Sequence, residues 1–218
     1  MNFPKFQFTL TGFMPLLMHA DDIDGADKLE EWRKSPANKN MSKPGDDRSP
    51  AWTYQTYVYG DGKHVVMPAE NIMAALRGAG AQLILKRQKT FKEISQSGLL
   101  IDGEACQFFN AGKQIKLADI EKFHDEPFIK HVENCERLGF KLFKKRSRVG
   151  TAKHIRVRPR FDDWQVMGVI HVLKNEITED ILKQLFELAG RGGIGDWRPT
   201  AKTPGPYGQF RAELKRIE

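Results

Sequence analysis

The chain has 218 residues and a formal net charge of +7, with a pI near 9.4. Hydrophobic residues make up 40% of it, which is enough to bury a core and excludes a chain that is disordered throughout. The excess of lysine and arginine favours a polyanion or an anionic surface as the partner. The two cysteines, Cys106 and Cys135, match neither a disulfide framework nor a zinc-ligand spacing, and they indicate a reducing compartment.

Signals for export or membrane insertion are not found in the sequence. The first residues contain no basic segment followed by a long apolar run and a cleavage site of small residues. No stretch reaches the roughly 18 to 20 uninterrupted apolar residues of a membrane span. We therefore expect a cytoplasmic protein with no membrane partner.

The N-terminal part predicts one strand followed by a long insertion. Apolar and polar side chains alternate over residues 6–10, which is typical of a half-buried strand. Residues 20–50 are polar and rich in glycine and proline, with a helical pattern only near residues 28–33. We interpret them as an inserted, mobile loop.

The middle of the chain predicts a hairpin and a helix. Two β-rich runs within residues 52–67 flank Gly60-Asp61-Gly62, a composition that favours a tight turn. Pro68 suits the first turn of a helix, and apolar residues recur at helical spacing over residues 69–85. Residues 99–101 and 107–109 lean towards strand. For residues 118–139, helix, loop and peripheral subdomain all stay open.

The C-terminal part predicts two strands, a helix, a glycine-rich loop and a last strand. The strands are expected at residues 155–161, 166–173 and 209–217, and the helix at residues 179–189 with Thr178 as its N-cap. This order favours the α+β class. We expect a ferredoxin-like (RRM-like) antiparallel sheet with helices on one face. The chain is then one domain, residues 1–218, with insertions at about 20–50 and 86–150 that form a thumb or web.

Residues 141–160 carry the densest positive charge and contain no acidic residue. Such a segment attracts a nucleic-acid backbone and releases its counterions. Residues 141–153 are expected to form a flexible loop, whereas residues 155–161 alternate as a strand that places three arginines on one face. A merely solvated strand face is the alternative interpretation. The basic residues are Lys141, Lys144, Lys145, Arg146, Arg148, Lys153, Arg156, Arg158 and Arg160.

The glycine-rich loop at residues 189–210 is a second candidate for nucleic-acid contact. Glycines let a backbone approach phosphate closely, and an aromatic ring can stack on a base. The binding residues proposed here are Arg191, Trp197, Arg198 and Tyr207. Alternatively, the glycines only end a helix and form turns, and Trp197 fills the edge of a core. A further basic run at residues 86–92 is either a contact with RNA or DNA or the exposed end of a helix.

An acidic segment after the first strand could carry chemistry. Paired carboxylates at Asp21 and Asp22, next to His19 and Asp24, could hold a divalent ion or polarise a ribose hydroxyl. The plainer interpretation is a polar loop. The other histidines show no triad or metal-ligand spacing, and we assign no cofactor and no resident metal.

Three pieces of the sequence resemble the repeat-associated mysterious protein (RAMP) superfamily, which forms the guide-RNA-binding backbone of CRISPR effector complexes. They are FTLTGFMPLLMH at residues 8–19, VVMPAENIMAALRGAG at residues 65–80, and AGRGGIGDWRP at residues 189–199 with YGQF at residues 207–210. The DWRP and YGQF pieces, with RVRPRFDDW at residues 156–164, are also similar to small proteins of tailed bacteriophages.

This resemblance implies a ferredoxin-like fold that binds single-stranded nucleic acid between thumb and core and self-associates head to tail into an oligomer or filament. If the chain is phage-encoded, its place is the cytoplasm of a bacterial host. Some family members cleave bound RNA through an acidic residue after the first strand, a position that only Asp21, Asp22 or Asp24 can match.

Three functional hypotheses follow. The first is binding of single-stranded RNA or DNA without catalysis. The second is a metal-assisted endoribonuclease that uses Asp21 and Asp22. The third is a phage interaction or anti-defence protein whose basic surface grips an acidic host protein.

Overall fold

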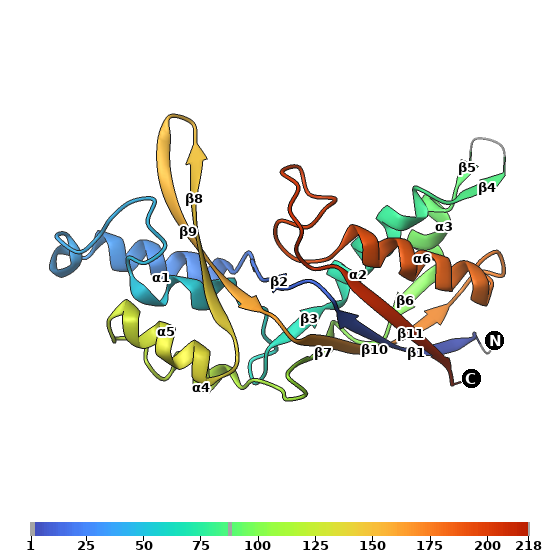
Figure 1. The fold of residues 1–218 in the computed structure, drawn as a ribbon, viewed down its shortest axis with the longest axis horizontal. Helices are drawn as coiled ribbons and strands as arrows, with labels where there is room; N and C mark the ends of the chain where they lie inside the picture. Colours follow the sequence, from blue (N-terminus) through green and yellow to red (C-terminus); the bar gives the residue numbers. More distant parts are fainter. Residues whose placement is uncertain (1–2, 87–88, 218) are drawn as a thin grey trace. The chain divides into compact units, whose positions relative to one another are not determined.

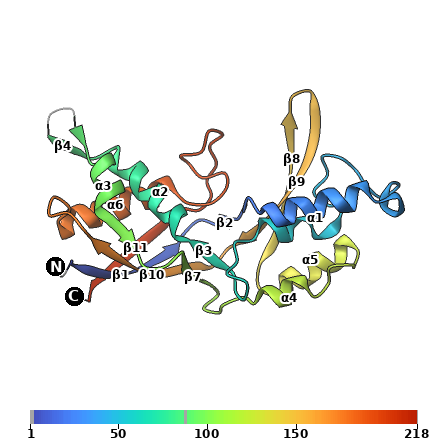
Figure 2. The same ribbon diagram turned by 180° about the vertical axis from the view of Figure 1, so that it is seen from behind.

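The computed structural model describes residues 3–86 and 89–217, which fold into two compact units. Unit 1 comprises Met1–Leu16, Val65–Gln114 and Asp162–Glu218, and unit 2 comprises Leu17–His64 and Ile115–Phe161. Both combine helices with antiparallel strand pairs, so the α+β class is confirmed (Figures 1 and 2). The sequence builds each unit from separate stretches of the chain.

Unit 1 is built on a six-stranded antiparallel sheet. The strand order is β11-β1-β10-β7-β3, and β6 also pairs with β10. The predicted alternation in the first strand is confirmed, because Phe6, Phe8 and Leu10 are buried in β1. The strands are β1 (Lys5–Gly12), β3 (Val66–Pro68), β6 (Leu99–Ile101), β7 (Ala105–Asn110), β10 (Trp164–Val172) and β11 (Phe210–Arg216).

Three helices cover one face of this sheet in both views of the ribbon (Figures 1 and 2). They are α2 (Ala69–Gly80), α3 (Lys92–Gly98) and α6 (Glu179–Gly192). Helices α2 and α6 pack together, and Phe186 of α6 lies 5.5 Å from Phe8 between ring centroids. Thr178 caps α6 as predicted, because its hydroxyl accepts the Ile181 N–H at 3.3 Å. A short ladder, β4 (Ile84–Lys86) with β5 (Lys89–Thr90), completes the unit.

Unit 2 joins a three-stranded sheet to short helices. The sheet has the order β2-β9-β8, and unit 2 begins at the second residue of β2. Its apolar core includes Trp52, Tyr54, Phe140 and Phe161, and the last two rings stack with centroids 5.0 Å apart. The elements are β2 (Leu16–Leu17), α1 (Ile23–Lys34), η1 (Pro36–Asn38), η2 (Ala51–Tyr57), α4 (Leu117–Glu121), α5 (Phe128–Arg137), β8 (Lys141–Val149) and β9 (Ala152–Phe161).

The hairpin predicted within residues 52–67 is wrong. Its first half is the 3₁₀ helix η2, where Trp52, Thr53 and Tyr54 are buried in succession, a pattern that an alternating strand cannot produce. The Thr53 hydroxyl donates to the Pro50 carbonyl and the Thr56 hydroxyl to the Thr53 carbonyl, both at 2.8 Å. Such local side-chain bonds to the backbone compete with a strand ladder.

Three further predictions differ from the structure. Residues 141–153 are not a loop, because residues 141–149 form β8 and pair with β9. Residues 20–50 contain the twelve-residue helix α1 instead of a short helical stretch. The helix that begins at Ala69 ends at Gly80, where an added Cβ would lie 2.5 Å from the Ser95 hydroxyl oxygen.

The region left open at residues 118–139 forms α4 and α5. None of the helices formed by the described residues is long and apolar enough to cross a membrane.

Candidate nucleic-acid interface

The basic segment forms an antiparallel hairpin, β8–β9, whose register sorts its cations onto two faces. Side chains that are directly opposite share a face, and faces alternate along each strand. One face carries the opposed pairs Lys141↔Arg160, Phe143↔Arg158 and Lys145↔Arg156, while the other carries Arg148↔Lys153. The prediction that Arg156, Arg158 and Arg160 share one face is therefore confirmed.

Three of the opposed pairs have the same charge on both members. Lys141 faces Arg160, Lys145 faces Arg156, and Arg148 faces Lys153. Like charges directly opposite each other destabilise a strand pair, and the cost grows as salt is removed. A polyanion laid along the hairpin relieves this repulsion. Asp47 compensates Arg156, so the repulsion is clearest between the exposed Arg148 and Lys153.

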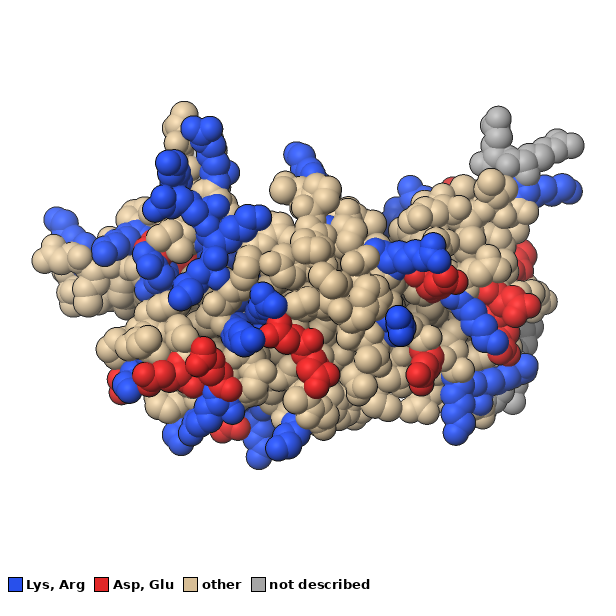
Figure 3. All heavy atoms as spheres, viewed as in Figure 1, with Lys and Arg blue, Asp and Glu red and all other residues tan. Residues whose placement is uncertain are grey.

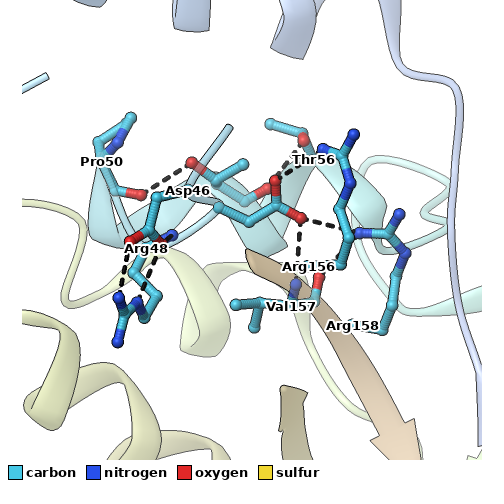
Figure 4. A network of polar contacts seen from close by, with 9 residues as sticks. Asp46, Arg48, Pro50, Thr56, Arg156, Val157 and Arg158 are labelled. Atoms are coloured by element: carbon cyan, nitrogen blue, oxygen red, sulfur yellow. Dashed lines mark hydrogen bonds and ion pairs between the residues drawn. The ribbon is translucent and has the colours of Figure 1, made fainter. Parts of the chain in front are cut away.

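A buried carboxylate, Asp47, anchors the base of β9. Asp47 is 2% exposed and accepts a bond from Arg156 Nη1 at 3.1 Å, from Arg158 Nη1 at 3.0 Å and from the Val157 N–H at 3.0 Å. Figure 4 shows Arg156, Val157 and Arg158 gathered along one edge of this network. One carboxylate thus serves two guanidinium groups, so a positive charge remains at the base of the hairpin.

The three strand arginines differ in exposure, contrary to the expectation that all present themselves to phosphate. Arg158 is 5% exposed, and its guanidinium lies over the Tyr57 ring at 4.3 Å from the centroid. Burial raises the pKa of the Tyr57 hydroxyl, which keeps this ring neutral. Arg156 and Arg160 are half-buried. Arg158 therefore holds the hairpin to its unit, and it presents little surface to a ligand.

The exposed cations of the hairpin lie on β8 and at the start of β9. They are Lys141, Lys144, Lys145, Arg146, Arg148 and Lys153. Figure 3 shows lysine and arginine side chains gathered over β8 and β9. The remainder of unit 2 has more acidic than basic residues. The positive charge of unit 2 is thus concentrated on one projecting element.

The loop before η2 runs along β9 and adds a further ion pair. Asp46 forms a parallel bridge with Ile155, and the Ile155 N–H donates to the Gly45 carbonyl at 2.8 Å. Arg48 donates to both Asp46 carboxylate oxygens, through Nε at 2.9 Å and Nη2 at 2.6 Å (Figure 4). Side-chain hydrogen bonds from Arg48 hold the pKa of Asp46 below its usual value.

The other predicted binding residues lie in unit 1. Arg191 is exposed and paired with Glu187, while Arg198 donates through Nη1 to the Gly195 carbonyl at 2.9 Å. Trp197 and Tyr207 are half-buried. The predicted site is thus divided between two units, and the structure brings together the members on the β8–β9 hairpin.

The glycines of residues 189–210 fold the loop closely against itself. A Cβ at Gly208 would lie 1.8 Å from the Ile194 carbonyl oxygen, and one at Gly205 would lie 2.3 Å from that of Trp197. Gly208 also has a φ of +72°. These close backbone approaches account for the glycines through packing and turns, without a ligand.

The acidic segment after the first strand forms the start of α1. Asp22 is the N-cap residue and Asp24 lies in the first turn, where carboxylates favour the helix dipole. Asp21 is exposed, and the His19 ring meets the Tyr57 ring edge-on at 4.9 Å. Over residues 3–86 and 89–217, no group of three or more His, Cys, Asp or Glu side chains is placed to hold a metal ion.

The basic run at residues 86–92 falls partly outside the described residues. Lys86 ends β4, Lys89 begins β5 and Lys92 begins α3, whereas Arg87 and Gln88 are not described.

Sequence reasoning missed Asp47, which pairs with two strand arginines from more than a hundred residues away. No local spacing signals that pairing. Compared with known proteins, the chain matches no protein-family model and no curated protein sequence. The assignment of a function therefore depends on the geometry and charge of the hairpin.

Proposed function

We propose that this protein binds single-stranded nucleic acid through the β8–β9 hairpin of unit 2, without catalysis. The observation that carries the proposal is the row of exposed cations Lys144, Arg146, Arg148 and Lys153 along the hairpin, in which Arg148 lies directly opposite Lys153. Like charges directly opposite each other on a strand pair cost stability. An anionic partner that binds to these cations would offset this cost in stability, which accounts for the like charges.

The chemistry of the cations favours phosphate as the anion. Arg146 and Arg148 are exposed and present planar guanidinium groups, which match phosphate oxygens in a bidentate geometry. Lysines 144, 145 and 153 add point charges along the same element. Repeated cations on an extended element suit a repeating anion, and the resemblance to the RAMP superfamily favours a single strand.

The ferredoxin-like fold expected from the sequence is part of the proposal and concerns unit 1. What supports it is the chain order β1, α2, β7, β10, α6 and β11, which follows a β-α-β-β-α-β pattern with antiparallel neighbours in the sheet. Helices on one face of that sheet support it as well (Figure 1).

Fluorescence anisotropy with labelled single-stranded RNA and DNA of mixed sequence, measured over a series of salt concentrations, tests the function. Each phosphate contact on a single strand contributes about 0.7 to the slope of log affinity against log salt. Removing three cations together, as Arg146→Ala, Arg148→Ala and Lys153→Ala, is therefore expected to weaken binding and to reduce that slope by about 2.

A control variant with the same loss of charge carries Lys113→Ala, Lys202→Ala and Lys215→Ala, all at exposed positions of unit 1. It is expected to retain most of the affinity and slope. Equal losses in both triple variants, or an affinity of the native protein that does not respond to salt, would refute the proposal.

The purified protein offers a second test that separates nucleic acid from an acidic protein as the partner. We expect a raised absorbance ratio of 260 to 280 nm that falls after nuclease treatment. A partner that stays bound after nuclease treatment contradicts the proposal and favours an acidic protein.

A further inference from the structure

Unit 2 contains a cavity of about 740 Å³ beside the hairpin. Its walls include Trp32, Lys43, Trp52, His124, Glu126 and Phe128, which come from α1, the loop before η2, η2 itself and the segment that leads into α5. Cavities of about 300–1,000 Å³ lined by aromatic groups and a few polar ones are typical of small-molecule sites. This one is far larger than a single water molecule needs.

An aromatic platform forms one wall of the cavity. The His124 imidazole stacks on the Trp52 indole, with ring centroids 4.7 Å apart and an interplanar angle of 18°. Trp52 is 6% exposed, whereas His124 is exposed. One face of the imidazole therefore rests on a buried indole, and the opposite face is open to a ligand.

The orientation of His124 is set by Gln55 in η2. The Gln55 side chain donates through Nε2 to the Ile120 carbonyl at 3.0 Å, so its Oε1 is the acceptor that faces His124 Nδ1 at 3.2 Å. Nδ1 consequently carries a proton, and the ring is held in plane on Trp52. A platform whose orientation is fixed in advance loses little entropy when a planar ligand stacks on it.

Both strands of the hairpin contact residues that line this cavity. Asp46, which lines it, bridges to Ile155 of β9, and Phe128, which also lines it, has the Lys144 ammonium over its ring at 5.9 Å from the centroid. The cavity wall also mixes cations at Lys43 and Arg48 with carboxylates at Asp125 and Glu126. A heterocycle with both donors and acceptors on its edge finds both kinds of partner there.

We propose that the cavity receives one base of the nucleic-acid strand bound by the hairpin, stacked on His124. This inference rests on the proposed function. Stacking a base on an aromatic side chain is worth about 1–3 kcal/mol and is tolerant of sequence, because every base has a π-face. The hairpin thus holds the backbone through charge, and the cavity adds affinity that does not depend on salt.

Anisotropy with two matched strands of equal length tests the inference, one with normal bases and one abasic at all internal positions. The native protein is expected to bind the normal strand about tenfold more tightly, the lower part of the range for stacking one base. His124→Ala is expected to remove this difference and to leave affinity for the abasic strand unchanged. His124→Phe keeps a flat ring and is expected to restore the preference.

Phe13→Ala serves as the control, because it removes an exposed aromatic ring of unit 1 that does not line this cavity. It is expected to change neither affinity. Because His124→Ala uncovers Trp52, its thermal unfolding is compared with that of the native protein. A strand that carries 2-aminopurine gives a readout on the native protein itself: its fluorescence is expected to be quenched on binding at one or more positions.

The outcomes separate the two proposals. Equal binding of the normal and abasic strands by the native protein, or the absence of quenching at every position, overturns the cavity inference and leaves hairpin binding intact. Failure to bind either strand overturns the proposed function itself.

Discussion

At the scale of single residues, Asp47 does more for unit 2 than its position in a polar loop suggests. Its carboxylate meets two guanidinium groups and a backbone N–H of β9, and it is almost fully buried. The Arg158 side chain is equally buried, so both charges have left water. A buried pair of this kind contributes little when intact, but removing one member leaves the other charge uncompensated.

We therefore expect Asp47→Asn to lower the free energy of unfolding by about 3–5 kcal/mol, measured by urea denaturation. The matched change Asp46→Asn removes an ion pair whose arginine is 42% exposed, and we expect it to cost about 1 kcal/mol or less. Equal effects of the two variants would contradict the role assigned to burial.

His131 is a second buried polar residue whose environment has a measurable consequence. Its Nε2 faces the Glu126 carbonyl at 3.1 Å and therefore carries the proton of the neutral ring, so its Nδ1 accepts from the Tyr54 hydroxyl at 3.2 Å. Burial lowers the pKa of His131 below its usual value of 6.5.

Because this pKa is lowered, the unfolded chain binds a proton more readily than the folded one. The contribution of His131 to stability is present above pH 6.5 and is lost as the pH falls through its lowered pKa. Unfolding free energies measured at pH 7.5, 6.5 and 5.5 are expected to decline for the native protein and to decline less steeply for His131→Gln. An equally steep decline for His131→Gln would contradict this assignment.

At the scale of elements, the β8–β9 hairpin has a charge pattern that a strand pair selected for stability alone would not keep. At Arg148 and Lys153, both exposed, the repulsion can be converted into attraction by one substitution. Function and stability then make opposite demands on the same position.

Arg148→Glu is accordingly expected to raise the free energy of unfolding by up to about 0.5 kcal/mol, since an exposed pair of opposite charge replaces a repulsive one. The same variant should bind nucleic acid more weakly than Arg148→Ala. Urea denaturation at low salt and anisotropy measure the two effects. A loss of both stability and affinity would mean that the opposed charges do not repel in the free protein.

Two glycines with left-handed backbone allow a comparison, one in the glycine-rich loop of unit 1 and one at the hairpin tip of unit 2. Gly208 has a φ of +72° and no room for a Cβ, whereas Gly150 at the hairpin tip has a φ of +58° and nothing within 4 Å of the added atom. Gly150→Ala is expected to cost about 1–2 kcal/mol for the backbone alone. Gly208→Ala should cost clearly more, because the Ile194 carbonyl must also move. Similar losses in thermal unfolding would contradict this account.

At the scale of the whole molecule, the sequence predicts elements that depend on local patterns. The alternation of Phe6, Phe8 and Leu10 predicts β1, and the cap at Thr178 predicts the start of α6. Both signals lie within a few residues of the element that they specify. The antiparallel α+β class follows from the order of such elements.

Features that depend on distant partners could not be predicted in this way. The lysine-rich half of the hairpin is a strand because its backbone pairs with β9, although its own side chains indicate a loop. The aromatic run at residues 52–57 has the composition of a strand, but packing against α5 and the hydroxyl bonds of Thr53 and Thr56 make it η2. The His124 platform likewise joins residues that are about seventy positions apart.

The burial of both cysteines has a practical consequence for labelling chemistry. Burial raises the pKa of the Cys106 thiol to about 11 and that of Cys135 to about 12, so neither offers a thiolate to an alkylating reagent at neutral pH. A cysteine introduced as Thr151→Cys, exposed beside Gly150, is therefore expected to react with a maleimide dye alone, as mass spectrometry can establish. The native chain can carry one reporter at the hairpin tip without the prior removal of its own cysteines.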